Sequence, residues 1–302
     1  MSNTLEQLCN ALDENRVRYR PNIPLSEYTT FAVGGATPLL IEPVSEGQIA
    51  AVISASSRLG VPYYVIGNGS NLLVDDAGVD FPIIHLGKNF SSIAVSEAGL
   101  LCQSGANIID ASAFAMAHEL SGLEFAYGIP GTVGGAVYMN AGAYGGQIEN
   151  IVNWVTAVDT TGKLMRFEAS ELDFSYRHSV FKDSGMCVTT VSMELARGDG
   201  EAIKAASYKN MELREQKQPL ELASAGSTFK RPEGAFAGAL IEQCGLKGFR
   251  IGRAGVSEKH AGFVVNYGGA SCADVLAVIH HVQDTVKAQT GYFLDTEVIY
   301  LH

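Results

Sequence analysis

The chain has 302 residues, 47% of them hydrophobic and 18% charged, which is the length of two ordinary domains with enough apolar material for a sizeable core. Its formal net charge of −11 argues against a nucleic-acid partner. No apolar run approaches the roughly 18 residues of a membrane helix, and the polar N-terminus lacks the order of a signal peptide, so we expect a cytoplasmic protein without a membrane partner.

Two further features of composition bear on ligands. Residues 1–199 carry 21 acidic and 10 basic side chains, whereas residues 200–302 carry 11 of each, so an anionic ligand is expected on the C-terminal third. The five cysteines are scattered and form no CxxC, which is typical of reduced core residues. No disulfide and no metal site is expected.

The first expected elements are two helices. Leu5, Leu8 and Leu12 share one face of an N-terminal helix. Ser45 and Gln48 form a capping box that opens a second helix.

A glycine-rich turn, GNGSN from Gly67 to Asn71, follows between two apolar strands, VPYYVI and LLV. It is neither the GxGxxG that opens a Rossmann helix nor the GK[ST] of a P-loop. Its backbone N–H groups and the side chains of Ser70 and Asn71 can nevertheless bind phosphate.

The most distinctive stretch is GIPGTVGGAVYMNAGAYGG, Gly128 to Gly146, which holds seven glycines. Glycine has no Cβ, so this backbone can approach a large ligand closely. Ordering so much glycine costs conformational entropy, so we expect a bound cofactor here. A set of tight turns packed against a sheet is the alternative.

The rest of the chain alternates helices and strands, with a change of composition at 196–200 that marks a domain boundary. Helices are expected over Asn107–Leu120, Ile203–Arg214, Gly234–Cys244 and Ala273–Thr290, and strands over Ile151–Asp159, Lys163–Phe167, Cys187–Leu195 and Thr296–Leu301. The last helix has a Ser271/Asp274 cap and ends at Gly291.

Motifs of common hydrolases are missing: the chain has no HExxH and no GxSxG. What remains is two glycine-rich turns and a polar, cationic loop, Ala223 to Pro232. A cofactor held by backbone N–H groups, with an anionic substrate delivered by a second domain, fits this arrangement.

Seven motifs together identify a family resemblance. They are TTFAVGG (29–35), VIGNGSNLLV (65–74), GIPGTVGGAVYMNAGAYG (128–145), SYRHSVFK (175–182), GSTFKRP (226–232), VSEKHAGF (256–263) and LDTEV (294–298). In this order, the chain resembles the UDP-N-acetylenolpyruvoylglucosamine reductases of cell-wall synthesis over nearly its whole length. Its length resembles the shorter subtype, which lacks a substrate-covering loop.

The resemblance implies an α+β fold of the vanillyl-alcohol-oxidase type. Two α+β subdomains would bind FAD over residues 29–198, after a helical lead-in over 1–28. A C-terminal α+β domain over 199–302 would bind the substrate. The cofactor turns contain no histidine, so FAD is expected to be bound non-covalently.

The implied reaction reduces the enolpyruvyl ether of UDP-N-acetylglucosamine to UDP-N-acetylmuramate with NADPH. By position in the motifs, Arg177 would pair with the substrate carboxylate and Ser227 would protonate the α-carbon. Glu297 would assist as a protonated acid or as an orienting group. Thr296 departs from the proline that many members have at this position.

The resemblance also implies binding residues. For the cofactor these are Thr30, Gly67, Asn68, Gly69, Ser70, Asn71, Gly128, Thr132, Gly134, Gly135 and Gly142. For the substrate they are Lys217, Arg231, Lys259 and His260, the histidine having a structural role as its alternative.

Two other functions remain open at this point. One is an FAD-dependent oxidase or dehydrogenase of another hydroxy acid or sugar on the same fold, which would accept oxygen and ignore the UDP group. The other is a non-catalytic nucleotide-sugar-binding module, which would purify without colour.

Overall fold

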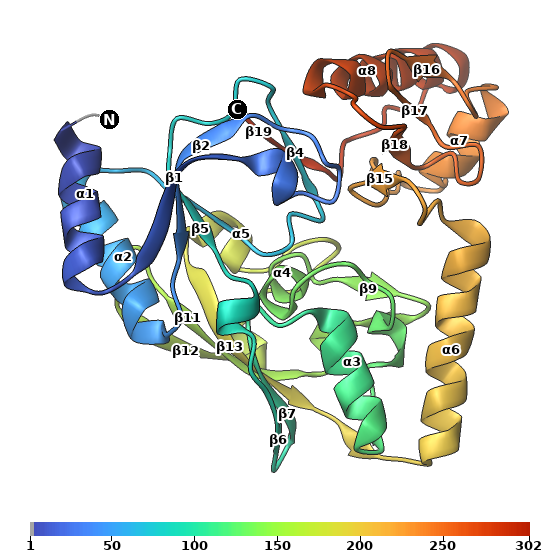
Figure 1. Ribbon diagram of the computed structural model, residues 1–302. Helices are drawn as coiled ribbons and strands as arrows, with labels where there is room; N and C mark the ends of the chain where they lie inside the picture. The colour runs from blue at the N-terminus through green and yellow to red at the C-terminus, as the bar shows by residue number, and fades with distance from the viewer. Residues whose placement is uncertain (1–2) are drawn as a thin grey trace. The chain divides into compact units, whose positions relative to one another are not determined.

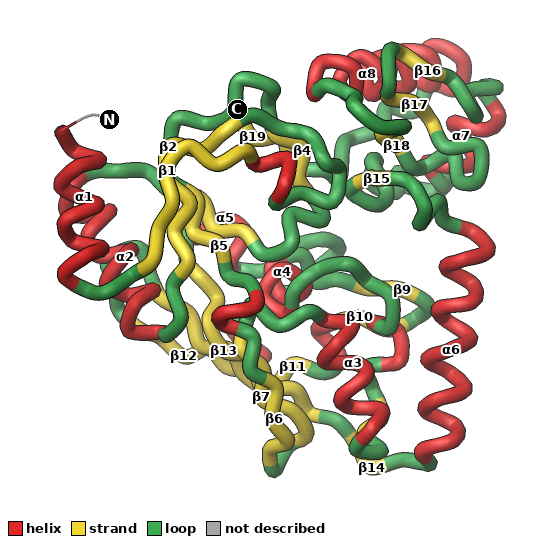
Figure 2. Tube along the Cα trace, in the orientation of Figure 1, coloured by secondary structure: helices red, strands yellow, loops and turns green. Residues whose placement is uncertain are grey.

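The computed structural model describes residues 3–302 and is a mixture of helices and strands (Figures 1 and 2). The chain forms two compact units. Unit 1 consists of the chain up to Pro21, Pro38–Asn68 and Phe81–Glu212. Unit 2 consists of Asn22–Thr37, Gly69–Asp80 and Leu213–His302. The division falls within a helix, later than the change of composition at 196–200, and the three-part division by sequence stays a prediction.

The N-terminal sheet has four strands in the order β1-β2-β5-β3. Strand β5 runs parallel to both β2 and β3. Buried apolar residues of helices α1 and α2 share one core cluster with buried residues of β2 and β5. The bounds are α1 (Asn3–Glu14), β1 (Arg18–Pro24), β2 (Ala36–Glu42), α2 (Glu46–Leu59), β3 (Tyr64–Ile66) and β5 (Ile83–His85).

The larger sheet of unit 1 has five antiparallel strands in the order β12-β11-β13-β7-β6. Helices α3 and α4 contribute buried residues to the core that covers it. The bounds are β6 (Ile93–Ser96), β7 (Gly99–Gln103), α3 (Ile108–Ala117), α4 (Val133–Tyr138), β11 (Val152–Val158), β12 (Leu164–Glu168), α5 (Phe181–Ser184) and β13 (Cys187–Glu194).

Unit 2 contains an antiparallel sheet in the order β15-β18-β17-β16, with helix α8 packed against it. A second, parallel pair joins β4 to β19, so residues 72–74 lie beside residues 299–301. The bounds are β4 (Leu72–Val74), β15 (Ala223–Ser224), α7 (Ala237–Gln243), β16 (Arg250–Ile251), β17 (Ala254–Val256), β18 (Val264–Asn266), α8 (Cys272–Thr290) and β19 (Ile299–Leu301).

One long helix and several short elements complete the described chain. Helix α6 (Gly200–Lys217) crosses the division between the units. Two-residue strands pair as β8 (Leu120–Ser121) with β14 (Ala196–Arg197) and β9 (Gly142–Ala143) with β10 (Gly146–Gln147). The 3₁₀ helices are η1 (Leu25–Glu27), η2 (Lys88–Phe90), η3 (Glu124–Ala126), η4 (Ile148–Asn150) and η5 (Ala169–Glu171).

The elements expected after residue 100 are confirmed, with ends shifted by no more than three residues. The cap of α8 is the expected box, since Ser271 Oγ accepts from the Asp274 N–H and Gly291 ends the helix with a φ of 80°. At α2, Ser45 Oγ accepts from the Gln48 N–H, but the Gln48 side chain accepts from Val44 and not from Ser45.

The N-terminal lead-in differs from the expectation. Its helix, with Leu8 and Leu12 fully buried, ends at Glu14, and the chain continues as strand β1. Pro21 and Pro24 cannot donate the hydrogen bonds of a helix, so the α-helix does not extend through residues 18–24, and only the short 3₁₀ helix η1 follows at Leu25–Glu27.

No helix within residues 3–302 combines the length and apolar character needed to cross a membrane. The cysteines are free thiols, four of them buried and Cys244 partly so. Burial raises the pKa of the Cys102 and Cys187 thiols to about 12, so both are held protonated and unreactive at neutral pH.

Candidate functional site

The glycine stretch of unit 1 is built around the short helix α4. Thr132 is its N-cap and accepts a hydrogen bond from the Gly135 N–H at 3.2 Å. The Gly134 N–H donates to Ser104 O at 2.8 Å, and a Cβ on Gly134 would lie only 2.7 Å from Ser104 Cβ. Close packing on Ser104 therefore explains why Gly134 has no side chain.

Gly135 has no comparable packing reason. It is exposed, and a Cβ there would meet only Thr132 Oγ1, at an ordinary 3.4 Å. A glycine inside a helix costs about 1 kcal/mol relative to alanine. The bare backbone of Gly135 is thus open to a ligand, which fits the expected approach of a large cofactor.

The turn at Gly67 and Asn68 lies against this stretch. A Cβ on Gly67 would overlap Thr132 Oγ1. The Asn68 Nδ2 group donates to Asn107 Oδ1 at 2.8 Å and to Pro130 O at 3.1 Å. The structure therefore brings the predicted cofactor turn at Gly67 and Asn68 to the segment of Thr132, which lies more than 60 positions later in the sequence.

Gly128 and Gly142 lie at the two ends of the stretch. Gly128 has a φ of 107°, a conformation that other residues avoid. Gly142 pairs with Gln147 in the small hairpin of β9 and β10. Both positions shape the turns. Between them, the N–H groups of Val133, Gly134 and Gly135 donate within the protein.

In unit 2, Thr30 is linked to two other predicted segments. Its Oγ1 donates to Ser224 O at 2.7 Å, and its N–H donates to Gly69 O at 3.4 Å. Gly69 has a φ of 58°, and a Cβ there would overlap Tyr28 O. Only glycine fits at this crossing of two backbones. Ser70 follows it, partly exposed.

Asn71 connects the same turn to the C-terminal segment. Its Nδ2 donates to Glu297 O at 3.0 Å, and its own carbonyl accepts from the Ile299 N–H at 2.9 Å. The predicted cofactor turn and Glu297 are therefore fixed to each other within unit 2.

Ser227 and Glu297 lie on two segments that pair side by side. The Glu297 N–H donates to Thr228 O at 2.8 Å, and the Lys230 N–H donates to Asp295 O at 2.8 Å. Phe229 and Thr296 form the bridge between these two bonds. Thr228 is buried, and its Oγ1 accepts from the Val264 N–H, which anchors the Ser227 loop to β18.

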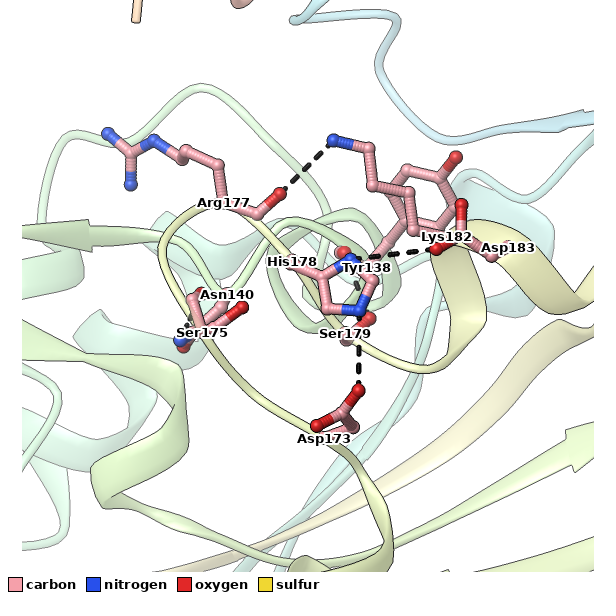
Figure 3. A network of polar contacts seen from close by, with 9 residues as sticks. All are labelled: Tyr138, Asn140, Asp173, Ser175, Arg177, His178, Ser179, Lys182 and Asp183. Atoms are coloured by element: carbon pink, nitrogen blue, oxygen red, sulfur yellow. Dashed lines mark hydrogen bonds and ion pairs between the residues drawn. The ribbon is translucent and has the colours of Figure 1, made fainter. Parts of the chain in front are cut away.

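Arg177 belongs to unit 1 and lies at the tip of a turn (Figure 3). Ser175 and His178 exchange two backbone hydrogen bonds, which leaves Tyr176 and Arg177 as the two central residues. Arg177 has a φ of 56°. Its side chain extends away from His178 in Figure 3.

The predicted substrate cations all belong to unit 2. Lys217 is the exposed last residue of α6. The Arg231 guanidinium lies over the Phe236 ring, 4.0 Å from its centre, and Lys259 Nζ lies 3.8 Å from Glu221. These side chains present positive charge at the surface of the neutral C-terminal third.

His260 is held by its own turn. Its Nδ1 accepts from the Gly262 N–H at 3.1 Å, and its ring packs edge-on to Phe263. Burial lowers the pKa of His260, so its neutral form is favoured. These contacts favour the structural alternative for this residue.

Two residues with a part in this architecture were not singled out from sequence. Asn140 and Lys182 lie within the quoted motifs, and both bond to backbone carbonyls of the Arg177 turn. The only signal in the sequence was their place within motifs of the family. Both bond to backbone carbonyls, Asn140 to Ser175 O and Lys182 to Arg177 O, and residue types do not indicate such bonds.

The residues fit FAD as the bound group. A dinucleotide needs backbone N–H groups for its diphosphate and a surface without side chains for close approach. The exposed Gly135 provides a surface without a side chain. The glycine-rich turn Gly67–Asn71, with Gly69 at a positive φ, is the segment that offers backbone N–H groups.

Comparison with known proteins places both parts of the chain. Residues 37–168 match the model of an FAD-binding domain, and residues 218–301 match that of the UDP-N-acetylenolpyruvoylglucosamine reductase C-terminal domain. A UDP-N-acetylenolpyruvoylglucosamine reductase of Heliobacterium modesticaldum is 46% identical, covering 91% of this chain and 88% of the relative.

Solved structures agree with this. The UDP-N-acetylenolpyruvylglucosamine reductase of Thermus caldophilus superposes with a TM-score of 0.83 at 34% identity, covering 95% of this chain and 100% of that one. A chitooligosaccharide oxidase, at 13% identity and a TM-score of 0.50, covers 93% of this chain and 59% of that one, a similarity of fold alone.

These matches confirm the α+β, vanillyl-alcohol-oxidase-type FAD-binding fold with a C-terminal α+β domain. The chain therefore belongs to the peptidoglycan-synthesis family of UDP-N-acetylenolpyruvoylglucosamine reductases and is an FAD-dependent oxidoreductase.

Proposed function

We propose that this protein reduces the enolpyruvyl ether of UDP-N-acetylglucosamine to UDP-N-acetylmuramate in the cytoplasm, with NADPH as reductant and Ser227 as proton donor. The observation that carries the proposal is the pairing of residues 228–230 with 295–297, which aligns the segments of Ser227 and Glu297. Ser227 and Glu297, the two residues that the resemblance assigns to protonation, therefore lie in or next to two segments that pair with each other.

The cofactor would be held, without a covalent link, by the glycine-rich segments 67–71 and 128–142. When bound there, FAD would supply the hydride chemistry that links NADPH to the methylene carbon of the enolpyruvyl group. The chain's own residues then have two tasks, which are to stabilise the negative charge that develops beside the substrate carboxylate and to protonate the α-carbon.

Arg177 suits the first task. Its planar guanidinium can form two parallel hydrogen bonds with a carboxylate, which a lysine ammonium cannot. Its cation also stabilises charge that spreads onto that carboxylate as the carbon–carbon double bond is reduced. Arg177 therefore distinguishes a substrate with the enolpyruvyl carboxylate from one without it.

Ser227 suits the second task, because a carbon-centred anion is basic enough to take a hydroxyl proton. The balance of the reaction is one hydride on the methylene carbon and one proton on the α-carbon, with the serine proton replaced from solvent. Glu297, on the paired segment, would assist as a protonated acid or by orienting the hydroxyl.

The nucleotide end of the substrate carries a diphosphate. Arg231 lies four residues after Ser227 on the same loop, so one segment can serve both ends of the substrate. Lys217 and Lys259 are the further cations that we assign to this diphosphate. His260 has a lesser part, because its ring nitrogen is used within its own turn.

The test is Ser227→Ala, studied as two half-reactions without oxygen. We expect NADPH to bleach the flavin of the variant at the wild-type rate, whereas the enolpyruvyl substrate reoxidises it at least about 100-fold more slowly, the scale of a lost general acid. Stopped-flow absorbance measures both steps.

The matched control is Ser54→Ala, which removes an exposed hydroxyl on helix α2 and should leave both half-reactions unchanged. An equal loss of both half-reactions in Ser227→Ala, or no loss in either, would contradict the role of Ser227.

A further inference from the structure

The backbone of Arg177 has a conformation that its residue type disfavours. In the four-residue turn 175–178, only the second central residue has a positive φ, as in a type II turn. Glycine is the usual residue at that position, because a Cβ in the left-handed region costs roughly 1–2 kcal/mol. The protein keeps an arginine there, so other contacts must hold the turn in place.

The entry to the turn is held by Asn140. This side chain is 1% exposed, and its Nδ2 donates to Ser175 O at 3.1 Å and to Glu149 Oε2 at 2.9 Å. Its Oδ1 accepts from the Glu149 N–H at 3.1 Å. Asn140 thus connects the end of the glycine stretch to the first residue of the Arg177 turn, with its amide fully used (Figure 3).

A second bond runs beside it. Ser179 is fully buried, and its Oγ donates to Tyr138 O, at the end of α4, at 2.9 Å. The segments 138–140 and 175–179 are therefore joined on both sides of the turn. Removing the hydroxyl of Ser179 would leave the Tyr138 carbonyl without this donor, which would lower the free energy of unfolding by about 1–3 kcal/mol.

Lys182 holds the tip itself. Its Nζ donates to the carbonyl O of Arg177 at 3.1 Å, in the half-buried part of the network (Figure 3). Such a charge-assisted bond is about twice as strong as a neutral one. Lys182 lies in α5, which the buried Phe181 anchors to the core by an edge contact with Phe167. The ammonium group is therefore attached to a fixed element.

The ion pairs of His178 contribute less. Its ring nitrogens lie 3.6 Å from Asp173 and 3.8 Å from Asp183, and both carboxylates are more than 80% exposed. Exposed pairs of this kind are worth about 0–1 kcal/mol. The bonds of Lys182 and Asn140 reach backbone carbonyls of the turn itself, and they help to offset the cost of the positive φ.

From these contacts we propose that Lys182 and Asn140 are positioning residues, which hold the peptide of Arg177 in its left-handed conformation and so direct its guanidinium. The inference rests on the proposed pairing of Arg177 with the substrate carboxylate. Without the Lys182 bond, the peptide can rotate to the negative φ that arginine prefers. The guanidinium then moves away from the carboxylate, and a displacement of about 1 Å is enough to cost 10²-fold in rate.

The experiment compares Lys182→Met with wild-type holoenzyme, using two ligands in calorimetry. One is the enolpyruvyl UDP-sugar, and the other is UDP-N-acetylglucosamine, which lacks the carboxylate. We expect the affinity of Lys182→Met for the first to fall at least tenfold and its affinity for the second to change less than twofold. An equal loss of affinity for both ligands, or no loss for either, overturns the proposal.

A second readout separates positioning from a general structural role. In the anaerobic half-reactions, Lys182→Met should slow reoxidation by the enolpyruvyl substrate about 10- to 100-fold while reduction by NADPH is unchanged. Added to Arg177→Ala, the same substitution should slow reoxidation no further, because its effect acts through Arg177. Additive losses in the double variant contradict the proposal.

Three companion variants complete the design. Lys182→Arg keeps a cationic donor and should restore most of the wild-type rate. Asn140→Ala should reproduce the selective loss for the carboxylate-bearing ligand. Lys163→Met, which removes an exposed lysine from the turn after β11, is the matched control and should behave as wild type.

Failure of the inference is distinct from failure of the proposed function. If wild-type enzyme binds the two ligands equally and the enolpyruvyl ligand does not reoxidise it, the carboxylate pairing of Arg177 is wrong and the inference falls with it. If wild type and Lys182→Met prefer the enolpyruvyl UDP-sugar over UDP-N-acetylglucosamine to the same extent, only the positioning role of Lys182 is wrong.

Discussion

His260 shows how a residue can look like a ligand-binding group in sequence and be occupied locally in the structure. Its Nδ1 accepts a hydrogen bond from the Gly262 N–H, and its ring packs against Phe263. Burial is the main cause that lowers its pKa below the ordinary 6.5, helped by the charge of Lys247 and opposed by that of Glu242. A protonated ring would lose its role as acceptor.

This lowered pKa predicts a dependence of stability on pH. Below pH 6.5 the unfolded state binds more protons at this site than the folded state does, so the free energy of unfolding must fall as the pH falls. His260→Gln, which cannot titrate, should show a shallower loss of stability between pH 6.5 and 5 than wild type. Urea unfolding at a series of pH values measures the difference.

Comparing His260→Gln with wild type removes the contribution of the other histidines to the pH dependence of unfolding. His85 also has a pKa lowered by burial, and its contribution is the same in both proteins. Parallel pH profiles for His260→Gln and wild type would show that His260 titrates as it does in the unfolded chain.

At the scale of elements, the start of helix α8 combines local and distant caps. Ser271 and Asp274 form the box expected from sequence. In addition, the Asp76 carboxylate accepts from the Cys272 N–H at 2.7 Å and from the Ala273 N–H at 3.0 Å. Asp76 lies in the segment 69–80, so this cap also ties the turn that contains Ser70 and Asn71 to the C-terminal helix of unit 2.

Asp76→Ala should therefore lower the free energy of unfolding by about 0.5–2 kcal/mol, the range measured for lost helix caps. The control is Asp284→Ala, an exposed carboxylate within the same helix, which should change stability by less than about 0.5 kcal/mol. Urea unfolding followed by circular dichroism is the measurement. Equal effects of the two substitutions would contradict the capping role.

Elements whose signals are local could be predicted from the sequence. The hairpin of β11 and β12 followed from two apolar runs around a glycine turn, and α8 followed from its cap, apolar stripe and terminal glycine. Strand β1 was missed because RYRPNIP is mostly exposed at the edge of its sheet and shows no alternation of apolar residues.

The candidate site likewise has a part that the sequence predicts and a part that it does not. The motifs identified Ser227, Arg177 and Glu297 by family resemblance, but no local pattern indicates that residues 228–230 pair with 295–297. The supports of Arg177 were missed for the same reason: Asn140 and Lys182 bond to backbone carbonyls, which sequence motifs do not record.

For the whole molecule, the account requires one chain to carry out two half-reactions with one bound flavin. The family assignment and the FAD-binding domain support the flavin. The cations that we propose for the nucleotide diphosphate lie in the neutral C-terminal third of a chain whose net charge is −11. In the proposed reaction, Arg177 selects the enolpyruvyl carboxylate and Ser227 protonates the α-carbon.

The absorption spectrum of the purified wild-type protein tests this account most directly. It is recorded without oxygen, first alone, then after NADPH, and then after the enolpyruvyl UDP-sugar. We expect a yellow protein that NADPH bleaches and that this substrate recolours, whereas UDP-N-acetylglucosamine does not recolour it. A flavin that only oxygen recolours would indicate an oxidase, and a protein that stays colourless after incubation with FAD would contradict the central claim.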